Sequence, residues 1–144
     1  MGTIQDKLTE QFGNMDKAYE SYAKAKGMTY LSLMVLEEIY ELGDGCTQKQ
    51  ISEDTHYPKQ SVNLVIKSFL ENGHIVLKEM PENRKNKQIF LTEKGRKLCE
   101  DIIVPLLAKE DKAISTMGEA ESEELIRLLE LYGKAYCDCL GDIM

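Results

Sequence analysis

The sequence has no hydrophobic run long enough to cross a membrane. Its longest wholly apolar stretch is confined to residues 102–108, whereas a membrane-spanning helix needs ~20 such residues. Residues 1–7 contain no basic segment followed by an apolar one, as a secretory signal requires, and Asp6 stands where a myristoylation signal has Ser or Thr. We therefore expect a soluble, cytoplasmic protein with no membrane partner.

Cysteine and histidine are also scarce. The cysteines are too few and too irregularly spaced for a disulfide framework; they are Cys46, Cys99, Cys137 and Cys139. A zinc site normally needs two close pairs of ligands, but only Cys137 and Cys139 are close in sequence, and both histidines, His56 and His74, are far from them. We therefore expect reduced cysteines, no metal and no cofactor, with redox sensing as the alternative role for the thiols.

Residue groupings typical of an enzyme are missing as well. The sequence contains no nucleophile paired with a base, no glycine-rich loop for phosphate and no paired metal ligands. The neighbouring carboxylates of Glu37 and Glu38, and those of Glu123 and Glu124, are interpreted as surface charges on helices. We therefore do not expect catalysis.

The net charge of −7 is unevenly distributed along the chain. Between Pro58 and Leu98, nine basic residues stand against four acidic ones, a local charge of +5, so the other 103 residues carry −12. A nucleic acid responds to the field within about a Debye length, ~8–10 Å, and not to the charge of the whole chain. This distribution predicts one surface that binds phosphates on an otherwise acidic protein.

Residues 29–98 are predicted to form three helices and a β-hairpin. Apolar residues at helical spacing indicate helices over about residues 29–42 and 58–72, and Thr47 with Gln50 forms a capping box that begins a short helix between them. Residues 75–80 and 88–91 have the character of strands around a polar tip at 81–87. Thr92 begins a long helix that we expect to bend near Pro105. The fold class is thus mainly α with a small β-hairpin wing (α+β), a winged helix-turn-helix.

Long amphipathic helices are predicted at both ends of the chain. One apolar stripe runs through residues 4–22 and another through residues 125–140. A helix that is apolar along one face must bury it, and the same face of a second copy can cover it in a two-fold homodimer. The alternative is that these helices cover only their own core. We divide the chain into an N-terminal dimerisation helix (1–27), a winged helix-turn-helix DNA-binding domain (28–98) and C-terminal dimerisation helices (99–144).

The helix over residues 58–72 has a polar face suited to reading DNA. Side chains three and four residues apart share a face, which places together Lys59, Gln60, Asn63 and Lys67. Asn and Gln pair with adenine, and Lys contacts guanine or phosphate. Ser61, in the first turn, is positioned to bond a phosphate oxygen at the helix N-terminus. The alternative interpretation is an ordinary solvated face.

The hairpin tip carries three cations, Arg84, Lys85 and Lys87. A narrow minor groove concentrates negative potential and attracts such side chains. The alternative is that these charges only prevent pairing of the strand edges. A polar helix face followed by a basic hairpin favours double-stranded DNA as the partner.

Four segments carry a resemblance to the MarR family of transcriptional regulators. Residues 28–36 resemble the family's Leu-Thr-x-x-Gln-x-x-x-Leu opening, with Ser32 in place of glutamine, and residues 47–52 are similar to its second DNA-binding-unit helix. Residues 61–63 stand where the family has Thr-Val-Thr. Residues 81–95 resemble the wing signature Asp-x-Arg followed at fixed spacing by Leu-Thr-x-x-Gly.

The chain also departs from this pattern in the wing and in the helix over residues 58–72. Asn83 replaces the aspartate of the wing and Lys85 replaces its arginine, so the usual acid–arginine pair is weakened, and Arg84 is the candidate substitute. A lysine is a point charge and lacks the planar fork of arginine. Leu64 stands where an arginine is frequent in the family.

The resemblance implies a homodimer that occupies a near-palindromic operator and releases it when a small aromatic or anionic effector binds. The effector pocket would lie between the dimerisation helices and the winged unit. Its candidate lining residues, which could equally be core, are Tyr19, Tyr22, Tyr30, Tyr132 and Tyr136. The family's oxidation-sensing branch has a cysteine in the first helix, where this chain has none. We expect a sequence-specific, ligand-responsive repressor; the alternative is a winged-helix protein–protein assembly module.

Overall fold

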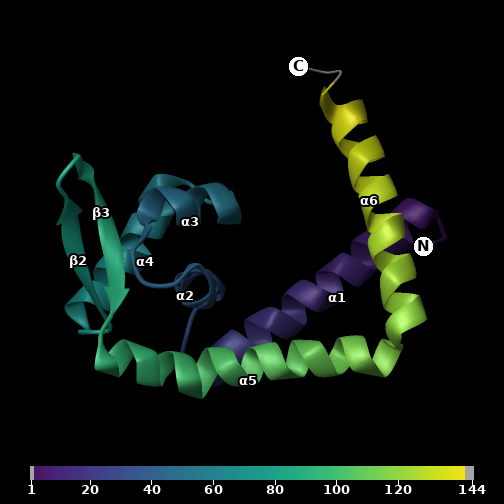
Figure 1. The fold of residues 1–144 in the computed structure, drawn as a ribbon. Coiled ribbons are helices and arrows are strands. Elements are labelled where there is room, and N and C mark those ends of the chain that lie inside the picture. Colours follow the sequence, from purple (N-terminus) through teal and green to yellow (C-terminus); the bar gives the residue numbers. More distant parts are fainter. Residues whose placement is uncertain (1, 142–144) are drawn as a thin grey trace. The chain divides into compact units, whose positions relative to one another are not determined.

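The computed structural model describes residues 2–141 (Figure 1). These residues form six helices and three strands: α1 (Ile4–Ala25), α2 (Tyr30–Leu42), β1 (Cys46–Thr47), α3 (Gln48–Thr55), α4 (Lys59–Glu71), β2 (Ile75–Met80), β3 (Asn83–Leu91), α5 (Glu93–Met117) and α6 (Glu119–Gly141). The chain divides into two compact units, one up to residue 104 and one from residue 105 on. The predicted fold class, mainly α with a small β-hairpin in a winged helix-turn-helix order, is confirmed.

Threonines begin three of the helices by capping them. The hydroxyls of Thr3, Thr29 and Thr47 accept hydrogen bonds from backbone N–H groups three residues later, which satisfies donors that the first helical turn leaves unpaired. The capping box predicted for α3 is present, since the Gln50 side chain also bonds the Thr47 backbone N–H at 2.8 Å. Helix α3 ends at Thr55, and the next residue, His56, has a left-handed backbone with φ of 62°.

The core of the first unit is centred on α2. Leu33, Leu36 and Ile39 are fully buried there, with apolar residues of α3, α4 and the sheet around them. Cys46 and Cys99 also belong to this core, and burial raises the pKa of each thiol to about 11. Both thiols are therefore protonated and unreactive at neutral pH.

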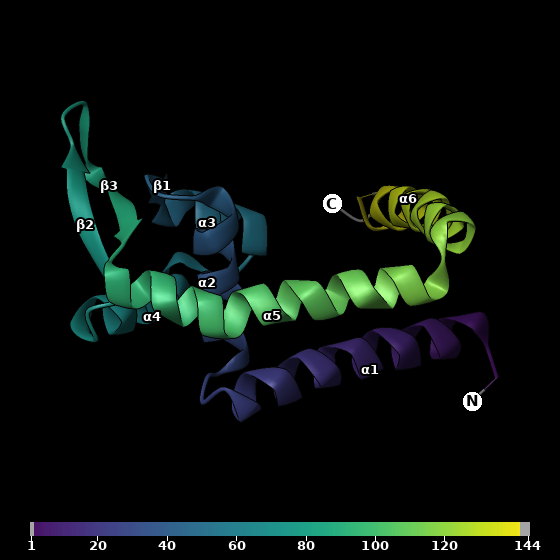
Figure 2. The ribbon, with the colours of Figure 1, turned by 60° about the horizontal axis from the view of Figure 1, so that its bottom comes forward.

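The three strands form an antiparallel sheet in the order β1-β3-β2. The two-residue strand β1 was not predicted, and it adds an edge by pairing Cys46 with Ile89. The hairpin also differs from the prediction, because β3 begins at Asn83 and not at residue 88. The cations therefore lie on the strand, and only residues 81 and 82 form the turn. The alternation of apolar and polar residues that marks a half-buried strand is absent here, because this end of the hairpin is largely exposed. The tip of the hairpin projects beyond the neighbouring helices (Figures 1 and 2).

The second unit consists of the later part of α5 and all of α6. Helix α5 includes Pro105 and continues to Met117, and Gly118, with φ of 95°, separates it from α6. None of the described residues of α6 is buried within this single chain. Neither helix, nor any other described helix, is long and apolar enough to cross a membrane.

Candidate nucleic-acid interface

Helix α4 presents two chemically distinct faces. Val62, Val65, Ile66 and Phe69 are buried against the core. The opposite face exposes the four side chains predicted to meet DNA: Lys59, Gln60, Asn63 and Lys67. Ser61, in the first turn, is partly exposed. The helix is therefore held by its apolar face, while its amide and ammonium groups are exposed on the opposite face.

A groove of about 610 Å³ lies between α4, the start of α3 and strand β3. We call it the lysine groove, because five lysines line it: Lys49, Lys59, Lys67, Lys85 and Lys87. None of the described residues that line it is acidic. Five ammonium groups around one concave surface create a positive potential that favours an anion such as phosphate.

Next to the lysine groove is a smaller hollow of about 450 Å³, bounded by the exposed face of α4. We call it the amide hollow; its lining residues are Gln48, Lys59, Gln60, Asn63 and Leu64. It shares Gln48, Lys59 and Asn63 with the lysine groove, so the two are continuous. The combined surface has hydrogen-bonding groups at its centre and cations around it.

Gln48 connects α3 to α4 and was not identified from the sequence. Its Nε2 donates to the carbonyl oxygen of Lys59 at 3.1 Å, and its Oε1 accepts from Asn63 Nδ2 at 3.2 Å. A primary amide has two N–H groups and an acceptor oxygen, so Asn63 keeps one donor and its oxygen for an adenine edge. The sequence feature that could have identified Gln48 is its position as the first residue of α3, directly after the Thr47 cap. A side chain at this position can reach α4.

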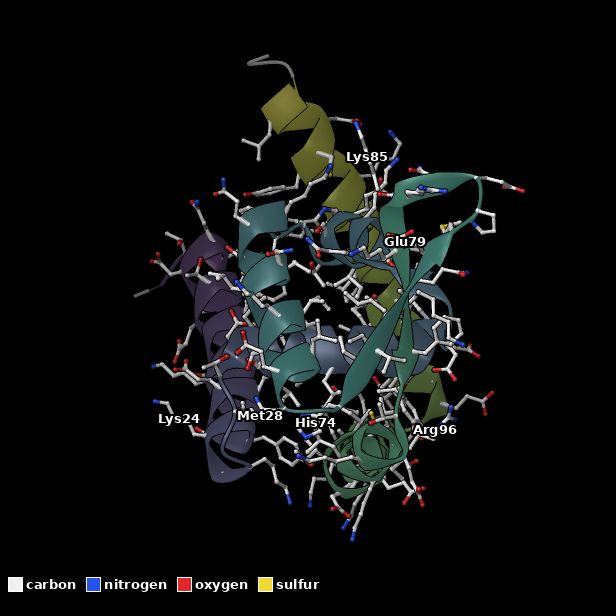
Figure 3. The ribbon with its side chains drawn as sticks, turned by 90° about the vertical axis from the view of Figure 1, so that its left-hand side faces the viewer. Lys24, Met28, His74, Glu79, Lys85 and Arg96 are labelled. Carbon is white, nitrogen blue, oxygen red and sulfur yellow. The ribbon has the colours of Figure 1, made fainter. Side chains whose placement is uncertain are left out.

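The hairpin contributes two of its three predicted cations to the lysine groove. Lys85 and Lys87 line it, while Arg84, also on β3, is exposed outside it. Figure 3 shows Lys85 near the free end of the hairpin, beside the gap between the hairpin and α4. Asn83 orders this end of the strand, because its Oδ1 accepts from the Lys85 backbone N–H at 3.2 Å.

The base of the hairpin is tied to the rest of the winged unit. Asp44 accepts from the Leu91 backbone N–H at 3.0 Å and from the Arg96 guanidinium at 2.8 Å. The Thr92 hydroxyl donates to the carbonyl oxygen of Gly73 at 2.6 Å, directly after α4. These bonds hold the cations of β3 at a defined position beside α4.

Three of the five tyrosines predicted to line an effector pocket lie in the first unit and are hydrogen-bonded there. The rings of Tyr19 and Tyr30 contact each other edge-on, with centroids 4.9 Å apart, and the Tyr19 hydroxyl donates to Glu37 at 2.9 Å. The Tyr22 hydroxyl donates to the Ile102 carbonyl oxygen at 2.6 Å. Burial raises the pKa of Tyr22 and of Tyr30, which keeps both as neutral donors.

The other two tyrosines lie on α6 in the second unit. The rings of Tyr132 and Tyr136 are 5.8 Å apart and about half exposed. Each unit therefore holds one group of the candidates, and neither group lines the lysine groove or the amide hollow. The effector pocket stays a prediction.

The cysteines, histidines and carboxylates of residues 2–141 form no candidate metal centre. No group of three or more of these side chains within that range is arranged to hold a metal ion. The four cysteines are free thiols, buried at positions 46 and 99 and exposed at 137 and 139. The side chains proposed to meet DNA carry ammonium, guanidinium, amide and hydroxyl groups.

Comparison with known proteins finds similarity to MarR family regulators in sequence and to their fold in structure. The sequence model described as MarR family matches residues 26–85, which include α2 to α4 and the start of the hairpin. The HTH-type transcriptional regulator MhqR of Bacillus subtilis (strain 168) is 26% identical over 137 residues, covering 90% of this chain and 94% of the relative.

Solved structures resemble the whole chain. A MarR family regulator from Neisseria meningitidis, NMB1585, superposes with a TM-score of 0.84 at 22% identity, covering 99% of this chain and 100% of that one. A putative MarR family transcriptional regulator from Listeria monocytogenes, complexed with a 26mer DNA, superposes with a TM-score of 0.74 at 25% identity, covering 96% and 91% of the two chains.

Proposed function

We propose that the chain is a transcriptional regulator of the MarR type that binds double-stranded operator DNA as a homodimer and acts as a repressor in the cytoplasm. The observation that carries this proposal is the lysine groove, whose five lysines adjoin the exposed amides of α4. The DNA present in the related Listeria structure supports the same partner. Residues 28–98 would form the DNA-binding part, and residues 1–27 and 99–144 the dimerisation helices.

The geometry suits a helix in the major groove with a hairpin beside it. The major groove, ~12 Å wide, admits an α-helix, and α4 can enter it with Gln60 and Asn63 toward the base edges. Lys59 and Lys67 then face the phosphates on either side. Arg84, Lys85 and Lys87 on β3 are placed to contact the backbone and the adjacent minor groove. The overall charge of −7 keeps other surfaces of the protein away from the duplex.

Base reading by α4 is tested by removing its amides. We expect Gln60→Ala and Asn63→Ala each to lower the affinity for a selected site about fivefold or more, because a good base contact contributes roughly 1–3 kcal/mol of discrimination. Affinity for random DNA should change less than twofold. The site is obtained by selecting duplexes from a randomised pool with the wild-type protein, and binding is measured by fluorescence anisotropy.

Matched controls for these variants are Gln5→Ala and Asn14→Ala, which remove exposed amides from α1. Both should bind the selected site as the wild type does. Equal losses for selected and random DNA in the α4 variants would contradict base reading. Salt titration separates DNA binding from the alternative of a protein assembly module. For a DNA-binding protein, the logarithm of the binding constant falls with the logarithm of the salt concentration, with a slope of about −0.9 for each neutralised phosphate. A slope near zero would contradict the proposed function.

The homodimer is supported by apolar side chains that a single chain leaves exposed. On α6, Leu125, Leu128 and Leu129 are 44%, 45% and 39% exposed. On α1, Ile4 and Met15 are 71% and 60% exposed. Apolar surface on this scale is typical of an interface, and a second copy offers the same stripes in a symmetric arrangement.

We expect the protein to sediment at micromolar concentration with about twice its chain mass of 16.4 kDa. Leu125→Glu combined with Leu129→Glu places two charges on one face of α6 and should raise the dimer dissociation constant at least tenfold. Val76→Glu, at a residue 42% exposed on β2, is the control that should remain dimeric. A wild-type protein that sediments as a monomer would rule the homodimer out.

A further inference from the structure

Leu64 is an apolar side chain in the middle of the polar face of α4. It is 69% exposed, whereas Val62, Val65 and Ile66 around it are at most 9% exposed. Single exposed leucines are common on protein surfaces, so exposure alone would carry no function. Leu64, however, forms one wall of the amide hollow, where all the other lining residues are polar.

The surroundings of Leu64 match the edge of a thymine. In the major groove an A·T pair presents the N7 acceptor and amino donor of adenine next to the O4 acceptor and the C5 methyl group of thymine. Gln60 and Asn63 supply hydrogen-bonding partners for base edges along the same groove, and Leu64 supplies an apolar contact for a thymine methyl group. No other base edge in the major groove of unmodified DNA carries a methyl group.

The distance between Gln60 and Leu64 along α4 suits contacts to two base pairs of the same half-site. Gln60 and Leu64 are one turn apart, which is ~6 Å along the axis at 1.5 Å per residue. Stacked base pairs are ~3.4 Å apart along one strand. A helix that follows the groove therefore places Leu64 about two base steps from the base that Gln60 contacts.

From this placement we propose that Leu64 is a specificity-determining residue that recognises the methyl group of a thymine in each operator half-site. The inference rests on the proposed function, in which α4 enters the major groove. Desolvation of the leucine against the methyl group would favour thymine over cytosine at that position, without any charge contribution to affinity.

The test removes the methyl group and leaves base pairing intact. Each thymine of the duplex selected by the wild-type protein is replaced singly by deoxyuridine, and binding is measured for the wild type and for Leu64→Ala. We expect one replacement per half-site to weaken wild-type binding about fourfold, the loss expected for one buried methyl group. The same replacement should not change the affinity of Leu64→Ala for the duplex. The salt dependence of binding should be the same for Leu64→Ala and for the wild type.

Leu42→Ala, at a leucine 39% exposed at the end of α2, is the control and should keep the wild-type response to deoxyuridine. Leu64→Ala is expected to fold, because the side chain is exposed and alanine favours helix. Equal losses in the wild type and Leu64→Ala at every thymine, or no loss in the wild type, would overturn this inference and leave DNA binding standing. Failure of the wild type to bind any duplex would instead overturn the proposed function, and this inference with it.

Discussion

Gly95→Ala is expected to lower the free energy of unfolding by about 3 kcal/mol, at the upper end of the usual cost of overpacking. Gly95 lies in the first turn of α5, where the helix meets the segment between α4 and β2. A Cβ at this position would overlap the carbonyl oxygen of His74 and approach Leu91 Cδ2 to 3.0 Å. The obstacle is therefore chiefly backbone, which cannot rotate away as a side chain can.

The His74 carbonyl is also fixed by its own hydrogen bond. It accepts from the Thr92 backbone N–H at 3.0 Å, so moving it would break a bond at the base of the hairpin. Lys94 adds a second tie, because its Nζ donates to the Asn72 carbonyl oxygen at 2.7 Å. Relief of the overlap must therefore separate α5 from the segment that follows α4.

Urea unfolding followed by circular dichroism measures the loss of stability. Gly13→Ala is the matched control, because Gly13 lies within α1 and a Cβ added there would meet no heavy atom within 4 Å. This control should be unchanged or more stable by up to about 1 kcal/mol, since alanine favours helix over glycine. If Gly95→Ala were as stable as the control, the overlap of the new Cβ with the His74 carbonyl oxygen would not limit stability, and the prediction would be wrong.

Replacing Lys67, Lys85 and Lys87 together by glutamine should weaken binding to all duplexes roughly a hundredfold at ~0.1 M salt, if each lysine neutralises one phosphate. The three residues line the lysine groove from α4 and from β3. The log–log salt slope should also fall in magnitude by about 2.7, or ~0.9 for each lost contact. Because phosphates are the same in every sequence, selected and random DNA should lose affinity alike.

The control carries the same change in net charge in the second unit. Lys109, Lys112 and Lys134 are exposed there, and their joint replacement by glutamine should leave the salt slope unchanged. If both triple variants lost affinity equally, the effect would come from total charge and not from the lysine groove. Adding Arg84→Gln to the variant that lacks Lys67, Lys85 and Lys87 tests whether this exposed cation outside the groove makes a further phosphate contact. Such a contact would lower the magnitude of the salt slope by about another 0.9.

Much of this arrangement could be predicted from local sequence patterns. The capping box at Thr47 and Gln50, the burial of one face of α4 and the exposure of its opposite face follow from residues three or four positions apart. The exposed residues of that face are Lys59, Gln60, Asn63 and Lys67. The hairpin was predicted as well, but the start of β3 was misplaced. An exposed strand has no alternation of burial, so its polar residues resemble a loop.

Other parts of the interface could not be predicted, because they join residues that are distant in the chain. Gln48 reaches Asn63 across 15 positions, and Lys49 lines the same groove as Lys85 and Lys87. The exposure of Leu64 was not predicted, although its spacing of four residues from Gln60 and three from Lys67 places it on the polar face of α4.

Caps and helical periodicity act between near neighbours, so the order of the amino acids was enough to predict where the helices begin, which face of α4 is polar and which family the chain resembles. Three features depend instead on packing: lysines from α3, α4 and β3 surround one groove, Gln48 orients Asn63, and Gly95 has no room for a side chain. Distances between separate elements are set by how their buried faces pack. No pattern of neighbouring residues encodes that packing.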